Sequence, residues 1–79
     1  MSKVKNYLFT PSPQLLDAVM DGYVTWREES VAVNAAYHSW TKAPLEQRRL
    51  AFDHYLAALD REEGAASHYG RLIEEVGRV

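Results

Sequence analysis

The spacing of apolar residues between Pro13 and Pro44 is the feature that most constrains this chain. Apolar residues recur there in alternating steps of three and four, a heptad pattern typical of a helix that packs along one stripe. The stripe has one polar member and reads Leu16, Val19, Tyr23, Trp26, Ser30, Val33, Tyr37 and Trp40. We therefore expect one long helix over about residues 13–41, with Ser12 as its N-cap and Pro13 in its first turn.

A second heptad pattern follows Pro44. Its first line reads Leu45, Phe52, Leu59, Ala66 and Ile73, and its second reads Arg48, Tyr55, Glu62, Tyr69 and Val76. A flanking line of small and apolar residues reads Ala51, Ala58, Ala65 and Leu72. We expect a helix over about residues 44–77. Gly64 and Gly70 each disfavour a helix interior by about 1 kcal/mol relative to alanine, so Gly64 is the expected point of a kink or break.

The short connection between these two segments makes them antiparallel neighbours. The predicted fold is all-α: an antiparallel hairpin of two long amphipathic helices over residues 14–79, with residues 1–13 as a leader that packs on the end of the hairpin. A reversal at residues 42–43 predicts that positions summing to about 85 face each other. The predicted pairs are Trp40 with Leu45, Val33 with Phe52, Tyr23 with Glu62, and Leu8 and Phe9 of the leader with Ile73 and Val76.

A chain of 79 residues without cysteine depends more on a partner chain for its stability than a longer or disulfide-bonded protein does. Small cores are marginal, and disulfides and thiolate metal sites are excluded here. Apolar residues also lie off the predicted stripes: Leu15, Met20, Val24, Val31, Leu56 and Leu72. We therefore expect a homodimer that forms a four-helix bundle. The alternative is a three-helix bundle in which the leader folds back and the chain breaks near Gly64.

Charge and hydropathy exclude several classes. A net charge of −2 with both signs scattered gives no basic face for nucleic acid, so we do not expect a nucleic-acid partner. No apolar stretch is long enough to span a membrane or to form a signal peptide, so we expect a cytoplasmic protein without a membrane partner.

The titratable residues predict no catalytic residue, no cofactor and no metal. His54 and His68 are fourteen residues apart on one helix, hence about 21 Å apart, and His38 lies on the other helix. Glu62 and Arg48 are the two charged residues on the predicted stripes. They cannot pair within one chain, but they would meet across the axis of an antiparallel dimer and fix its register.

Aromatic residues on the stripes are the strongest candidates for an interaction site. Large aromatic side chains at helical spacing are most simply core residues, although Trp, Tyr and Arg also dominate protein interfaces. The candidate interaction residues are Trp26, Trp40, Arg48, Tyr55, Glu62 and Tyr69.

The tip of the predicted hairpin reads Ser39-Trp40-Thr41-Lys42. A Trp at the tip of a short helical hairpin is similar to the small secreted WXG-type proteins of type VII secretion. The glycine that this family has two residues after the Trp is Lys42 here, and the chain is shorter, so no family is assigned.

These observations favour a non-enzymatic protein–protein interaction module: a self-associating hairpin that acts as a small adaptor, regulator or assembly subunit with a protein partner. One alternative is a small helical enzyme or ligand carrier with an aromatic-lined pocket at the dimer interface. A further alternative is a nucleic-acid-associated regulator that uses Lys42, Arg48 and Arg49.

Overall fold

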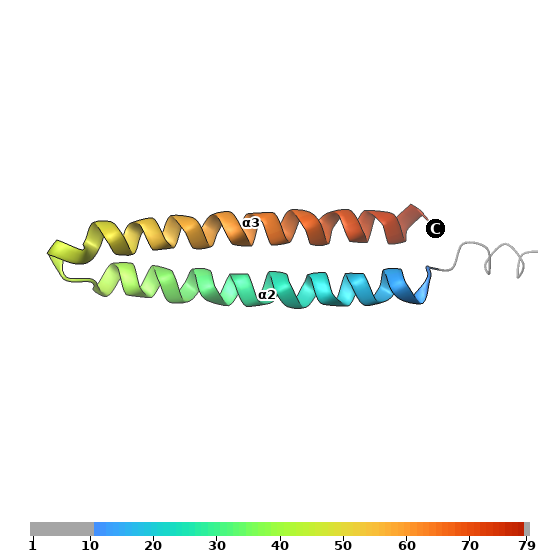
Figure 1. Cartoon of the computed structure of the whole chain (residues 1–79), viewed down its shortest axis with the longest axis horizontal. Coiled ribbons are helices and arrows are strands. Elements are labelled where there is room, and N and C mark those ends of the chain that lie inside the picture. Colours follow the sequence, from blue (N-terminus) through green and yellow to red (C-terminus); the bar gives the residue numbers. More distant parts are fainter. Residues whose placement is uncertain (1–10, 79) are drawn as a thin grey trace, which may run out of the picture.

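The computed structural model describes residues 11–78 and is helical almost throughout. Helix α2 spans Pro13–Lys42, a 3₁₀ turn η1 spans Leu45–Gln47, and helix α3 spans Arg48–Arg78. The two long helices run antiparallel and lie side by side along their length (Figure 1). The all-α prediction is confirmed. The predicted contacts of the leader residues Leu8 and Phe9 fall outside the described residues.

The start of α2 follows from two adjacent residues. The Oγ of Ser12 accepts a hydrogen bond from the backbone N–H of Leu15 at 3.1 Å. Pro13 takes the first helical position, where a missing N–H costs no hydrogen bond. The predicted N-cap is therefore confirmed.

The turn is longer than the sequence suggested because Pro44 does not itself begin the second α-helix. Ala43 is extended, with φ −67° and ψ 141°, as the residue before a proline tends to be. The 3₁₀ turn η1 then intervenes before α3 begins at Arg48. The Arg48 guanidinium donates to the carbonyl of Ala43 at 3.5 Å, across the turn.

The longer turn shifts the register of the hairpin by seven positions. Tyr23 lies against Tyr69, Tyr37 against Tyr55 and Trp40 against Phe52, and each pair sums to 92 rather than 85. The chain thus reverses about Glu46, not between Lys42 and Ala43. The predicted pairs Trp40–Leu45, Val33–Phe52 and Tyr23–Glu62 are wrong for this reason. The shift equals one heptad, so the same helix faces can still meet.

One line of each predicted stripe is more exposed than expected, although its central members, Ser30 in α2 and Leu59 and Ala66 in α3, are half-buried. Among residues 11–78, Gly22 and Ala58 alone are buried, and Ala58 retains 1% of its accessible surface. The alanine-rich line of α3 thus lies in the interface, whereas Leu45, Phe52 and Ile73 are exposed. In α2, Leu16, Tyr23 and Tyr37 are exposed in the same way. The helices meet on their small residues because these permit the closest approach of the two backbones.

Helix α3 continues through both of its central glycines. It runs unbroken from Arg48 to Arg78, so the break expected near Gly64 does not occur. A three-helix bundle that depends on that break is excluded with it. Gly64 and Gly70 are exposed, and a Cβ added at either would meet no atom within 4 Å.

Gly22 differs, because the partner helix lies directly over it. A Cβ added there would lie 3.0 Å from Leu72 Cδ1, 3.6 Å from Tyr69 Cδ1 and 3.8 Å from Tyr69 Cα. A large side chain at Gly22 must therefore separate the helices.

We predict opposite effects for the same substitution at these glycines. Gly64→Leu should raise the free energy of unfolding by roughly 0.5–1 kcal/mol, because leucine favours the helix and meets open space. Gly22→Leu should lower it by about 1–3 kcal/mol through overpacking. Urea denaturation followed by circular dichroism measures both at one protein concentration. A stabilised Gly22→Leu variant would contradict the close approach at this residue.

Candidate interaction surface

Two aromatic clusters with nearly the same geometry lie along one face of the hairpin. In the first, Trp26 stacks on Tyr69 with ring centroids 5.7 Å apart and an interplanar angle of 12°. In the second, Trp40 stacks on Tyr55 at 5.6 Å and 13°. Tyrosines complete both: Tyr23 lies 5.7 Å from Tyr69, and Tyr37 lies 5.7 Å from Tyr55. Such pairs each contribute about 0.5–1.5 kcal/mol beyond area burial.

The likeness of the clusters reflects a repeat in the sequence that heptad counting missed. Residues 18–26 and 32–40 both read Ala-Val-x-x-small-Tyr-x-hydroxyl-Trp, fourteen residues apart. Residues 51–55 and 65–69 both read Ala-x-x-His-Tyr, also fourteen apart. In the fold, residues 18–26 lie beside residues 65–69, and we call these two segments the distal module. Residues 32–40 lie beside residues 51–55, and we call these two segments the tip module. Self-comparison of the sequence at a fixed offset would have found this signal.

Glu62 lies between the two modules and accepts a hydrogen bond from the indole of Trp26. Trp26 Nε1–H donates to Glu62 Oε1 at 2.8 Å, and both residues are half-buried. The position equivalent to Glu62 beside the tip module is Arg48, fourteen residues earlier. Arg48 is exposed and contacts the turn, so its predicted place on the packed stripe is wrong. Trp26 also has the guanidinium of Arg27 over its ring, 5.9 Å from the centroid.

The predicted interaction residues therefore separate into two groups. Trp26, Trp40, Tyr55, Glu62 and Tyr69 are all half-buried along the line between the helices. Arg48 is exposed at the turn, where it lines an open hollow together with Trp40 and Thr41.

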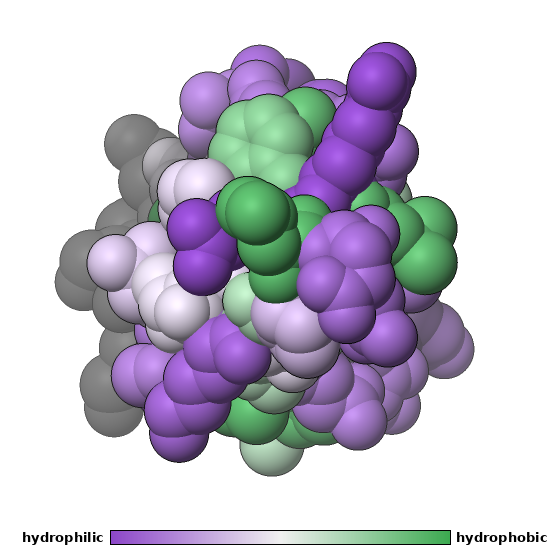
Figure 2. Space-filling model, turned by 90° about the vertical axis from the view of Figure 1, so that its left-hand side faces the viewer, coloured by the Kyte–Doolittle hydropathy of each residue, from purple (hydrophilic) through white to green (hydrophobic). Residues whose placement is uncertain are grey.

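The side of the hairpin that carries the two aromatic clusters also exposes large apolar side chains. We call this side the aromatic face. Ring contacts place Tyr23, Tyr37 and Phe52 on it, and steps of seven residues from Tyr23 and Phe52 add Leu16 and Ile73. These five side chains keep 36–46% of their accessible surface. At the tip, hydrophobic residues also lie at the surface between hydrophilic ones (Figure 2). Contiguous exposed apolar surface of this kind marks an interaction site.

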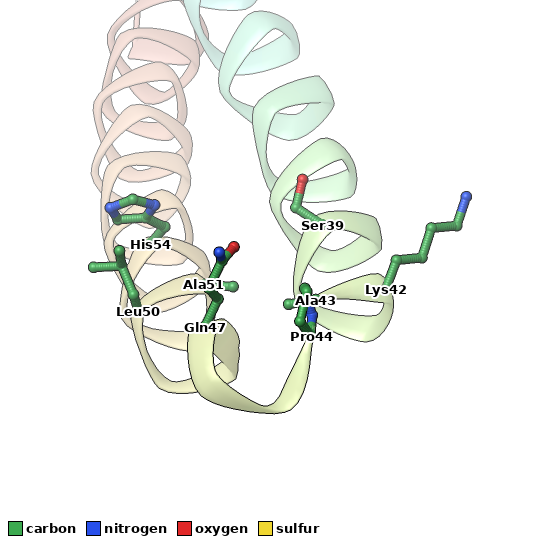
Figure 3. A pocket seen from close by; sticks show the side chains of 8 residues that line it. All are labelled: Ser39, Lys42, Ala43, Pro44, Gln47, Leu50, Ala51 and His54. Carbon is green, nitrogen blue, oxygen red and sulfur yellow. The ribbon is translucent and has the colours of Figure 1, made fainter.

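The opposite side of the hairpin has a groove that repeats with the same period. We call it the polar groove after its Ser, Thr, His and charged side chains, although alanines, Pro44 and Leu50 also line it. An open hollow of about 420 Å³ lies at the tip and is lined in part by Ser39, Ala51 and His54 (Figure 3). A second, of about 270 Å³, is lined in part by their repeat equivalents Thr25, Ala65 and His68. Between them, Arg61 Nε donates to Glu29 Oε2 at 3.2 Å and forms an ion pair. This pair is partly exposed and contributes at most about 1 kcal/mol.

The described residues place no three His, Asp or Glu side chains so that they could hold a metal ion. Nor does either long helix, as far as it is described, combine the length and apolar character needed to cross a membrane.

Comparison with family models, with curated proteins and with solved structures finds no match for this chain. Its function must therefore be inferred from its surface.

The hydrogen bond between Trp26 and Glu62 can be tested with a double-mutant cycle. Trp26→Phe and Glu62→Ala should each destabilise the fold, and they should show a coupling energy of about 1.5–3 kcal/mol, as expected for a hydrogen bond to a charged group. Urea denaturation of the four proteins at one concentration measures the coupling. Glu63→Ala, which alters an exposed neighbour, should change stability by less than about 0.5 kcal/mol. Additive effects of the two changes would contradict the bond.

Proposed function

We propose that this protein is a non-enzymatic interaction module that acts as a self-associating helical hairpin, with the aromatic face as its dimer interface. The observation that carries the proposal is the distribution of apolar surface. Between residues 11 and 78 no large side chain is fully buried, and eleven large apolar residues are exposed. Five of these eleven lie together on the aromatic face, on both helices, and the other six belong to other parts of the surface.

A second copy of the chain is the occupant that best fits this face. Two helices cover each other from one side, and a four-helix bundle supplies the missing side. The aromatic face is long and formed by both helices, as an interface between two hairpins requires. Its two like modules also match a partner that carries the same pattern. Closed C2 dimers are the commonest way to satisfy such a surface.

The polar groove would remain free in this dimer and would be available to a protein partner. It carries the Glu29–Arg61 ion pair and the two hollows with His54 and His68. A polar, partly charged groove suits a reversible contact, whereas the aromatic face suits a permanent one. This arrangement supports an adaptor or assembly subunit.

Sedimentation equilibrium should give a mass of twice the 9.0 kDa chain at micromolar concentration. The thermal midpoint should rise with protein concentration, because the dimer and not the monomer completes the core. A single chain mass at every accessible concentration would remove the proposal.

Matched lysine substitutions locate the interface. Ile73 and Val31 are both exposed, by 44% and 62%, but Ile73 belongs to the aromatic face and Val31 lies on the outer side of α2. Ile73→Lys should weaken the dimer at least tenfold, because it buries an unpaired charge. Val31→Lys should leave the dimer unchanged. Both are read by sedimentation, with circular dichroism to verify helix content. Equal effects would place the interface elsewhere.

A further inference from the structure

The tip module lacks a carboxylate that the distal module has. In the distal module, Trp26 Nε1–H donates to Glu62 Oε1 at 2.8 Å. The equivalent residues beside the tip module, fourteen positions along each helix, are Trp40 and Arg48. A guanidinium cannot accept a hydrogen bond. Within residues 11–78, Trp40 Nε1–H forms no hydrogen bond.

The two indoles otherwise have the same surroundings. Each stacks on a tyrosine of α3, Trp26 at 5.7 Å and 12° and Trp40 at 5.6 Å and 13°. Each also contacts the tyrosine three residues before it, with ring centroids 6.1 Å and 6.0 Å apart. Two such contacts restrict the orientation of a ring. The matching geometry therefore predicts that Trp40 Nε1–H is directed toward Arg48, as Trp26 Nε1–H is directed toward Glu62.

Arg48 supplies further donors at the same place. Together with Trp40 and Thr41 it lines an open hollow of about 250 Å³, which we call the Trp40–Arg48 hollow. Its guanidinium has five N–H groups, and one of its nitrogens donates to the carbonyl of Ala43 at 3.5 Å. None of the ion pairs within residues 11–78 includes Arg48. The hollow thus combines two kinds of hydrogen-bond donor with a positive charge that no described carboxylate neutralises.

The charges around the hollow also favour an anion. From Lys42 to Arg49 the chain carries three cations and one carboxylate, that of Glu46. All four charged side chains are exposed, so each contributes little to affinity by itself. Together they attract a negatively charged group to the tip.

We infer that the Trp40–Arg48 hollow binds an acidic side chain of a protein partner, with the carboxylate between the Trp40 indole N–H and the Arg48 guanidinium. The distal module shows the group that fits beside an indole in this geometry, since Glu62 occupies the equivalent place there. Guanidinium and carboxylate also form strong, charge-assisted hydrogen bonds. This inference rests on the proposed interaction function and names the chemistry of its partner.

The geometry can be tested within the chain itself. Arg48→Glu should allow Trp40 to donate as Trp26 does, so the Trp40 indole N–H resonance should move toward that of Trp26 and its exchange with water should slow. Arg49→Glu makes the same change of charge beside the site and should leave both unchanged. The chain has two tryptophans, and Trp26→Phe assigns their signals. Equal effects of the two glutamate substitutions would overturn the geometry.

A small carboxylate tests binding directly. The α-amide of N-acetylglutamate, added to the full chain at constant ionic strength, should shift the Trp40 indole N–H resonance and saturate with a Kd of about 100 mM or tighter, as one or two hydrogen bonds to a charged group allow. Arg48→Gln should weaken this binding at least tenfold, whereas Arg49→Gln should change it less than twofold. Equal shifts with the α-amide of N-acetylglutamine, or no saturable shift, would overturn the site.

Two further outcomes identify the ligand. Tighter binding of inorganic phosphate than of the glutamate derivative would overturn the assignment to a carboxylate. Arg48→Gln should leave the mass in sedimentation unchanged, and a loss of self-association would overturn the assignment to a separate partner. Failure of the probe to bind leaves the proposed dimer standing. A monomer that binds the probe would overturn the dimer and leave the site.

Discussion

The close approach of α2 and α3 at their small residues is the constraint on which the rest of the structure depends. Gly22 is buried because α3 lies directly over it, and Ala58 of α3 is buried as well. Backbones that meet on one side of a hairpin leave less room for large side chains between them. Tryptophan and tyrosine therefore lie beside this contact, where they stack between the two helices. The aromatic face is thus a direct consequence of where glycine and alanine lie.

Much of the fold could be predicted from local chemistry. Ser12 and Pro13 specify the start of α2, and Pro44 specifies its end, because cap and proline effects act over a few residues. The register could not be predicted, because it depends on the length of the turn and hence on whether Pro44 begins an α-helix or precedes a 3₁₀ turn. Gly64 was misjudged for a related reason: a glycine penalty of about 1 kcal/mol is too small to break a helix that is packed along its length.

The candidate site was predicted in part. Heptad spacing found the half-buried aromatic residues and Glu62, because side chains between two helices must recur at that period. It ranked large apolar residues above alanine, and so placed Phe52 in the interface and Ala58 beside it. The structure buries Ala58 and leaves Phe52 at the edge of the interface, packed on Trp40 but 36% exposed. Shape and not hydrophobicity decides which side chains fit where backbones are closest. The Trp26–Glu62 hydrogen bond could not be predicted from a pattern within one helix, because its partners are 36 residues apart and belong to different helices.

The fourteen-residue repeat also bears on how a hairpin like this one can change in length. Fourteen residues make four turns at the 3.5-residue period of packed helices, so adding or removing one unit leaves every remaining side chain on its original face. The change must occur in both helices together, since an unmatched unit would leave an aromatic module without its counterpart. Longer and shorter hairpins with the same cross-section are therefore accessible by paired duplication or deletion. The present chain, with two modules, has the smallest number at which such a repeat can be recognised.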